Sequence, residues 1–375
     1  MMIQEQQDEK QTMQTARTSA LPLFFTQPIG SLPRPQVVRD LVESRADSSA
    51  LDDMIRFAIR LQEQAGMDVV TDGEWRRSHY IQELFARVGG FERARRYEHQ
   101  GEQKTTFVVV GRMNWDKPVY ADDARFLVEN TDRVTKYALP SPFLIATRYW
   151  HADHSRDAYP TPEDFIDHLA EVMAAEARAL VDVGIDIVQI DDPALTYFCD
   201  RELMAGRGSH DERLRREWDP DRQIPRAVEA INRIADGLAA EVQLHCCHSV
   251  YKRQSDVRGN YKPLLPRLGD LKVDRVNLEF AYTGTGEVSD LKELPDHLSV
   301  GMGVVDVRRE AIPTMDDIVT LAEAAVATIS PSRIALNPDC GFAPDAGEPP
   351  TIDEAYAKLT RLTAAARLLR ERHAS

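Results

Sequence analysis

The feature that most constrains this chain is a series of eight short apolar segments separated by longer stretches of helical period. The segments cover residues 24–31, 67–74, 133–142, 185–195, 241–249, 273–281, 298–306 and 333–340. Strands that alternate with amphipathic helices are typical of a parallel sheet covered by helices. Because the count is eight, we expect an α/β fold in which the sheet closes into a (β/α)8 TIM barrel.

The separating stretches carry helix signals. Thr161 followed by Pro162 gives an N-cap and a proline in the first turn, and Gly184 marks the end of the same helix. Further helices are predicted over residues 51–66, 224–240, 315–329 and 352–373. Residues 100–130 differ, because the runs TTFVVVG and PVY have no helical period. They predict a hairpin inserted before the third strand.

Length and composition narrow the class of protein. The 375 residues contain no linker or repeat, so we expect a disordered tail over residues 1–20 and a single domain over 21–375. A formal net charge of −15 excludes a nucleic-acid partner, and no run approaches the roughly 20 apolar residues of a membrane span. The four cysteines are too few for a disulfide framework. A reducing cytoplasm is the expected location.

The carboxyl ends of the predicted strands carry ionisable or small polar residues. In a barrel of this type, these ends surround one mouth, where the active site is built. We therefore expect them to meet in space. They are Ser31, Glu74, Asp191, His245, Cys247, Glu279, Asp306 and Cys340.

The sharpest local pattern is His245-Cys246-Cys247. Side chains two apart on a strand share a face, so His245 and Cys247 can bind one ion together. Zinc prefers imidazole nitrogen and thiolate sulfur, and Cys340 and Glu279 can supply two further donors. The alternative is that the cysteines are small core residues, which we expect for Cys246 and Cys199. His248 is expected on the wrong face to be a ligand.

Six motifs resemble the catalytic barrel of the cobalamin-independent methionine synthases, in the same order, from about residue 24 to the end. They are IGS (29–31), DGE (72–74), VQIDDPAL (188–195), H-x-C (245–247), LEFA (278–281) and NPDCGF (337–342). The resemblance implies a zinc ion bound by His245, Cys247, Glu279 and Cys340. It also implies homocysteine binding by Ser31, Glu74 and Asp191, to which we add Gln189 of the same motif.

The implied roles are chemically sensible. Carboxylates can hold an α-ammonium group, and Ser31 with its neighbouring backbone N–H can hold an α-carboxylate. For Asp191 the alternative is a cap at the start of the following helix. A free thiol is largely protonated at neutral pH, whereas zinc deprotonates a thiol that it binds. Glu279 is then the natural group to leave zinc when the substrate sulfur arrives.

The chain departs from the family's pattern at three places. Full-length members carry a second, N-terminal barrel that helps to bind the folate donor, and we expect only the catalytic barrel here. The stretch between Cys247 and Glu279 is longer and contains a polar segment, 251–267, of open role. Where the family has GVYDIH, this chain reads GVVDVR, so Arg308 replaces a histidine. Arg308 cannot donate a proton at neutral pH, but it can hold an anion.

We therefore take Glu279, Asp306 and Arg308 as candidate catalytic residues of a zinc-dependent methyltransferase acting on homocysteine. A methylfolate or a corrinoid protein is the expected methyl donor. The alternative enzyme is a zinc thiol transferase of the kind that joins coenzyme M to an epoxide. A uroporphyrinogen-type decarboxylase is less well supported because it needs no zinc site of this kind. The non-enzyme alternative is a structural zinc protein.

Overall fold

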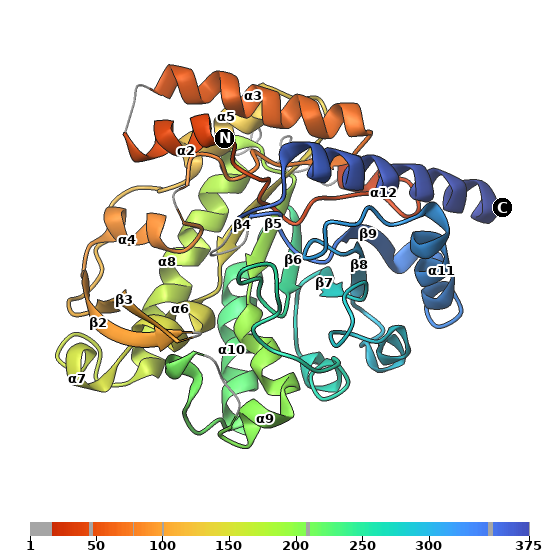
Figure 1. Cartoon of the computed structure of the whole chain (residues 1–375). Helices are drawn as coiled ribbons and strands as arrows, with labels where there is room; N and C mark the ends of the chain where they lie inside the picture. Colours follow the sequence, from red (N-terminus) through yellow and green to blue (C-terminus); the bar gives the residue numbers. More distant parts are fainter. Residues whose placement is uncertain are drawn as a thin grey trace, which may run out of the picture.

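The computed structural model describes residues 17–44, 48–77, 79–99, 101–207, 211–343 and 348–374. Within them, seven parallel strands form a curled sheet in the order β1-β4-β5-β6-β7-β8-β9, with helices around it (Figure 1). The strands are β1 (Val69–Val70), β4 (Val134–Pro140), β5 (Ile187–Asp191), β6 (Glu241–Cys246), β7 (Arg275–Glu279), β8 (Ser299–Val305) and β9 (Ile334–Pro338).

Residues 25–27 lie in the gap between the two edges of this sheet. Thr26 forms a parallel bridge with Leu336 of β9. The Thr26 carbonyl accepts a 3.1 Å hydrogen bond from the N–H of Val69 in β1. The short segment therefore occupies the eighth position, and the expected TIM-barrel-like closure is present.

The predicted length of the first strand, 24–31, was wrong, because this segment forms only the bridge between Thr26 and Leu336. Pro28 has no N–H with which to continue the ladder, and Phe24 has a left-handed φ of 51°. The second predicted strand, 67–74, is likewise reduced to the two residues of β1. There the chain turns away through Gly73, whose φ is 67°.

The predicted helices are confirmed as α3 (Ser48–Ala65), α8 (Pro162–Val183), α10 (Pro220–Ala235), α11 (Met315–Val326) and α12 (Ile352–His373). Thr161 caps α8 in a reciprocal pair of hydrogen bonds with Asp164, and Gly184 ends the helix with a φ of 113°. Further helices in the described ranges are α2 (Gln36–Glu43), α4 (Gln82–Val88), α5 (Ala121–Glu129), α6 (Pro142–Tyr149), α7 (Ala152–Ser155) and α9 (Arg201–Met204). Short 3-10 turns join them, including η1 (Pro193–Cys199).

The inserted hairpin lies before β4, as predicted, and the predicted run TTFVVVG overlaps its second strand. The partner strand is not the predicted PVY run but an earlier segment. The hairpin pairs β2 (Phe91–His99) with β3 (Glu102–Val109), at the side of the molecule near α7 (Figure 1). The first strand is rich in charge and shows no clear apolar alternation. The PVY run is not a strand. Tyr120 is buried and occupies the position just before α5, where its side chain makes no capping hydrogen bond.

The hairpin packs against the polar segment that follows β6. Lys252 Nζ lies 2.6 Å from Glu102 Oε1, and His99 Nε2 lies 3.3 Å from Asp256 Oδ1. The rings of His99 and Tyr251 are 4.0 Å apart. The first part of the segment 251–267 therefore supports the hairpin next to the mouth of the barrel.

The sheet and helices share a large apolar core, and Cys246 and Cys199 lie in it as predicted. Residues 1–16 of the predicted tail lie outside the described residues, but Arg17 already forms a 3.0 Å ion pair with the buried Asp186. The packed chain thus begins before residue 20. In the described ranges, no helix is long and apolar enough to cross a membrane.

Candidate functional site

Three of the predicted metal ligands meet at the mouth of the barrel. His245 is in β6, Cys247 follows that strand, and Cys340 follows β9. One donor atom from each lies within 4.8 Å of the other two. We call these residues the metal triad. Cys246, between the first two, is fully buried in the core, as the alternation of side chains along a strand requires.

The surroundings of His245 fit a metal ligand. Its Nδ1 lies 3.0 Å from Asp191 Oδ1, and because a carboxylate only accepts, Nδ1 carries the proton. Nε2 is then the nitrogen that can bind a metal in place of a proton. It is buried and, among the described residues, has no hydrogen bond of normal geometry. A carboxylate that orients an imidazole in this way is a common support of zinc-bound histidines.

The electrostatics of the two thiols also favour a cation. A hydrogen bond from Cys340 lowers the pKa of Cys247 to about 5, although burial opposes this. The same contact raises the pKa of Cys340. Burial alone would lower the pKa of His245, but Cys247 and Asp191 outweigh it and raise that pKa to about 10. The triad therefore holds protons where a metal would displace them, and its donor set is the one that zinc prefers.

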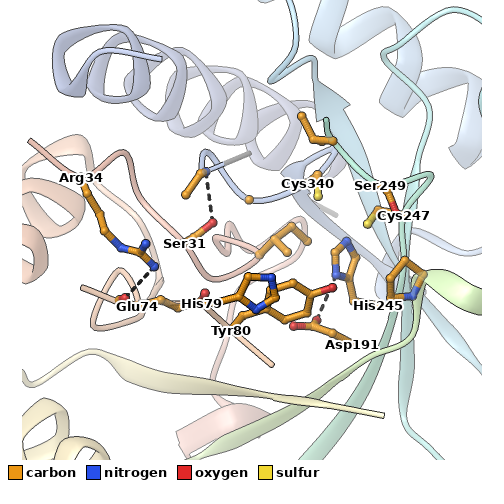
Figure 2. A pocket seen from close by; sticks show the side chains of 15 residues that line it. Ser31, Arg34, Glu74, His79, Tyr80, Asp191, His245, Cys247, Ser249 and Cys340 are labelled. Carbon is orange, nitrogen blue, oxygen red and sulfur yellow. Dashed lines mark hydrogen bonds and ion pairs between the residues drawn. The ribbon is translucent and has the colours of Figure 1, made fainter. Parts of the chain in front are cut away.

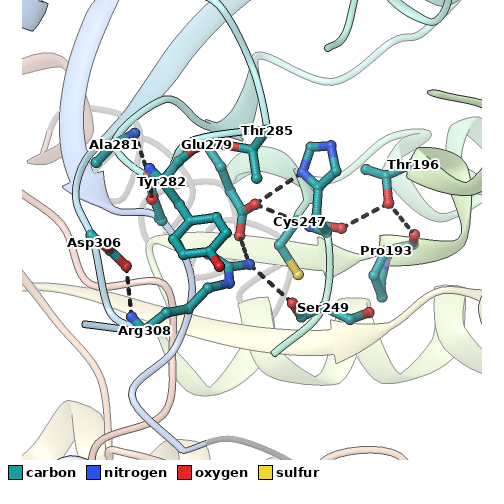
Figure 3. A network of polar contacts seen from close by, with 12 residues as sticks. Pro193, Thr196, Cys247, Ser249, Glu279, Ala281, Tyr282, Thr285, Asp306 and Arg308 are labelled. Atoms are coloured by element: carbon teal, nitrogen blue, oxygen red, sulfur yellow. Dashed lines mark hydrogen bonds and ion pairs between the residues drawn. The ribbon is translucent and has the colours of Figure 1, made fainter. Parts of the chain in front are cut away.

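Glu279, the fourth predicted ligand, is engaged elsewhere. Its Oε1 lies 2.7 Å from Arg308 Nη2, and its Oε2 lies 2.9 Å from His248 Nδ1 (Figure 3). Burial raises the pKa of Glu279, but Arg308 and His248 outweigh it and lower that pKa to about 2. The structure thus groups three of the four predicted ligands and pairs the fourth with Arg308.

The other two candidate catalytic residues lie outside the cavity that adjoins the triad. Arg308 is buried, and its guanidinium lies 4.8 Å above the ring of Tyr282. Asp306 accepts a 2.7 Å hydrogen bond from the backbone N–H of Arg308. Neither side chain lines the cavity described below. Asp306 therefore shapes the turn that carries Arg308.

A cavity of about 230 Å³ opens beside the metal triad. Figure 2 shows the triad at one end of it and Ser31, Arg34 and Glu74 at the other, with Asp191 next to His245. The sequence analysis predicted Ser31, Glu74 and Asp191 here. It did not single out Arg34, His79 or Tyr80, which also line the cavity. Arg34 follows the IGS motif by three residues, and this is the signal that would have identified it.

Glu74 reaches the cavity through an unusual backbone. Its φ is 58°, a left-handed conformation that non-glycine residues rarely adopt and that is often found at functional sites. A Cβ on Gly30 would lie 2.3 Å from Glu74 Oε1, so the glycine of the IGS motif makes room for this carboxylate. Burial raises the pKa of Glu74 to about 7, with Arg77 opposing the shift and Asp191 adding to it.

Asp191 contacts both the metal triad and the cavity, whereas Gln189 does not line the cavity. Gln189 Nε2 donates a 2.7 Å hydrogen bond to Asp191 Oδ1, and its Oε1 accepts one of 2.9 Å from the buried Lys136. Gln189 therefore supports Asp191 from inside the barrel. The helix-cap alternative applies to Asp192 instead, whose side chain accepts from the N–H of Ala194.

Ser31 ties the IGS loop to the NPDCGF loop. Its Oγ accepts a 3.2 Å hydrogen bond from the N–H of Ala343, and a Cβ on Gly341 would lie 2.2 Å from that oxygen. The N–H of Leu32, next to Ser31, donates to the Gly73 carbonyl at 3.0 Å. The Ser31 hydroxyl hydrogen and the Arg34 guanidinium are thus the groups at this end with which a carboxylate could pair.

Comparison with known proteins gives consistent results. A family model described as the catalytic domain of cobalamin-independent synthase matches residues 24–367. The methionine synthase of Pyrococcus abyssi is 29% identical over 363 residues, which cover 94% of either chain. The 5-methyltetrahydropteroyltriglutamate–homocysteine methyltransferase of Mycobacterium leprae is also 29% identical, over 96% of this chain and 45% of that protein.

The fold has a counterpart among solved structures. A B12-independent methionine synthase from Shewanella sp. W3-18-1, in complex with selenomethionine, superposes with a TM-score of 0.76 at 22% identity. The match covers 94% of this chain and 98% of the Shewanella chain.

Proposed function

Because this chain belongs to the family of the cobalamin-independent synthase catalytic domain, we propose that it is a methyltransferase that methylates the sulfur of homocysteine to give methionine. In this reaction the thiol loses its proton, an S–CH3 bond forms, and the bond from the methyl group to its donor breaks. The supporting observation is a metal triad at one end of a cavity whose other end carries Glu74, Ser31 and Arg34. The relatives' names support methyl transfer rather than the coenzyme M alternative.

The metal that this donor set suits is zinc, held by His245 Nε2 and the sulfurs of Cys247 and Cys340. When bound, zinc would lower the pKa of the substrate thiol so that its sulfur is a thiolate at neutral pH. Asp191 keeps the proton of His245 on Nδ1 and so directs Nε2 to the metal. All four cysteines of the chain are described, and all are free thiols, which agrees with a reducing cytoplasmic location.

The cavity suits the two charged groups of an amino acid. Glu74 and Asp191 are carboxylates on its wall and can hold an α-ammonium group between them. The Ser31 hydroxyl and the Arg34 guanidinium can hold the α-carboxylate at the end of the cavity away from the metal triad. Fixing both groups aligns the sulfur with the triad and removes much of the entropic cost of the transfer.

We propose a methylfolate as the donor, because the name of the M. leprae relative specifies one. A corrinoid protein remains the alternative donor. The sequence suggested that Arg308 could hold an anionic group of a substrate. Its full burial against Glu279 argues against that role and favours an action on the metal site itself.

Crystals of the zinc-loaded protein soaked with homocysteine would test the proposal. We expect the sulfur on the metal and the amino group between Glu74 and Asp191. An amino acid bound outside this cavity would refute the substrate assignment. A parallel assay with methylfolate should form methionine from homocysteine but no product from cysteine, whose thiol is one methylene closer to the amino group. Faster alkylation of coenzyme M than of homocysteine would favour the alternative enzyme.

A further inference from the structure

Both oxygens of the Glu279 carboxylate already accept hydrogen bonds. Oε1 pairs with Arg308 Nη2 at 2.7 Å, and Oε2 accepts from the backbone N–H of His248 at 3.2 Å while lying 2.9 Å from His248 Nδ1. All three side chains are completely buried. Bonds of this kind, with a charged partner and no competing water, are among the stronger ones in proteins. Glu279 would have to break at least one of them to bind a metal at the triad.

The groups that hold Glu279 are themselves fixed. Arg308 Nη2 also donates to the carbonyl of Ser249 at 2.9 Å, and the Arg308 backbone is held by Asp306. On the other side, Asp339 accepts hydrogen bonds from the backbone N–H groups that directly follow Glu279, at 2.8–3.1 Å. Figure 3 shows Arg308 between Glu279, Ser249 and Asp306. The Arg308 guanidinium thus restrains the Glu279 carboxylate, and Asp339 restrains the main chain that follows it.

The network is next to the metal triad without including it. His248 directly follows Cys247, and Asp339 directly precedes Cys340. Glu279 ends β7, which pairs with β6, the strand of His245. The Glu279 carboxylate is near enough to the triad for its charge to raise the pKa of Cys247. Whether it binds the metal therefore depends on the partner toward which its side chain is turned.

We propose that Arg308 is a positioning residue that holds the Glu279 carboxylate off the metal and so leaves a coordination place for the sulfur of the substrate. The identity of that sulfur compound rests on the proposed function, but the position of Glu279 does not. If Glu279 were a ligand, an incoming thiol would have to displace it. With Glu279 held by Arg308, the metal is bound by three protein groups and the thiol binds without that competition.

Four proteins test this proposal: the wild type, Arg308→Met, Glu279→Gln and the double variant with both substitutions. Zinc affinity is measured by competition with a chromophoric chelator, and zinc-loaded crystals show which atoms contact the metal. In the wild type we expect Glu279 on Arg308, and a zinc affinity that Glu279→Gln leaves nearly unchanged. In Arg308→Met we expect a Glu279 oxygen on the metal and zinc binding about tenfold tighter, within the range that changes beside a metal site produce.

Homocysteine affinity gives a second readout. In the cobalt-loaded proteins it is followed through the sulfur-to-metal charge-transfer absorption. We expect it to fall about tenfold in Arg308→Met, because the thiol must then displace a carboxylate. The double variant has no such carboxylate and should regain wild-type homocysteine affinity. A loss caused by misfolding would not be reversed by the second substitution.

Two results would overturn the proposal. One is a wild-type crystal with Glu279 on zinc, accompanied by a loss of zinc affinity in Glu279→Gln as large as that in Cys340→Ser. The other is an Arg308→Met protein with unchanged zinc and homocysteine binding. If Arg308→Met does not fold, the wild-type crystal and Glu279→Gln decide the question. A wild type that binds zinc but no homocysteine would refute the proposed function, while the zinc measurements would still decide the role of Arg308.

Discussion

The two ends of the cavity are built in different ways. The metal triad comes from β6 and β9, which are regular parallel strands, and the alternation of side chains along β6 points His245 and Cys247 to the same side. The amino-acid end comes from the irregular segments 25–34 and 67–77, where the sheet is reduced to one bridge and the two residues of β1. Strand geometry therefore positions the metal ligands, whereas tight contacts between loops position the substrate-binding groups.

The contacts at the amino-acid end have little tolerance. Glu74 has a left-handed backbone and its carboxylate lies where a side chain on residue 30 would be. Ser31 Oγ lies where a side chain on residue 341 would be. Small changes of shape should therefore disturb substrate binding at this end, while at the metal end the largest effects should come from changes in the chemistry of the ligands.

The largest effect is expected from removing a sulfur of the metal triad. Cys247→Ser and Cys340→Ser should each weaken zinc binding by at least about 100-fold and abolish methyl transfer, since a hydroxyl is a much poorer zinc ligand than a thiolate. Zinc content after dialysis and chelator competition would measure this.

Cys246→Ser is the matched control, because it makes the same change one residue away on the core side of β6. It should keep its zinc and its activity. If it loses zinc as readily as Cys247→Ser, the alternation that defines the triad is not what holds the metal.

A smaller effect is expected from Gly30→Ala at the amino-acid end. The added Cβ would lie 2.3 Å from Glu74 Oε1, so the carboxylate must move. A charged hydrogen bond is worth roughly 1.5–3 kcal/mol, which corresponds to a rise in KM for homocysteine of about 10- to 100-fold. Zinc binding should be unchanged, and steady-state kinetics together with zinc content would separate the two.

Gly269→Ala is the control for this substitution. Its nearest neighbour would be the Pro266 carbonyl oxygen at 3.9 Å, an ordinary contact, so its kinetics should match the wild type. Equal KM values for Gly30→Ala and Gly269→Ala would show that the position of Glu74 does not depend on Gly30.

The same contrast explains how much of the fold the sequence could predict. Residues 185–195 are rich in isoleucine and valine, residues 241–249 place Val242 and Leu244 two apart, and the two segments contain β5 and β6. Residues 24–31 gave the right place in the barrel but the wrong length, because Pro28 and the left-handed Phe24 interrupt the ladder. The first hairpin strand was missed because most of its side chains are charged or polar, so its sequence shows no clear apolar alternation.

For the site, the sequence predicted correctly those residues whose position follows from where a strand ends. His245, Cys247 and Cys340 follow from strand ends, and the structure brings them together. The pairing of Glu279 with Arg308 could not be predicted, because it depends on how two side chains share a buried space between β7 and the loop after β8. Gln189 was expected to bind the substrate. It lies two residues before Asp191 on β5, inside the barrel, and its side chain contacts Asp191 instead.

The smallest effect is expected from a change of pH, which should weaken amino-acid binding at the Glu74 end of the cavity. Burial raises the pKa of Glu74 to about 7, so the carboxylate that binds the ammonium group is present above this pH and is lost below it. Between pH 8 and pH 6 its ionised fraction falls from about 0.9 to about 0.1, so the Kd should rise about tenfold. Methionine is the suitable ligand for calorimetry, with zinc content checked at each pH, because it has the same amino group but no thiol to titrate. Glu74→Gln should bind methionine more weakly and lose this pH dependence; if the variant keeps it, another group near the cavity is responsible.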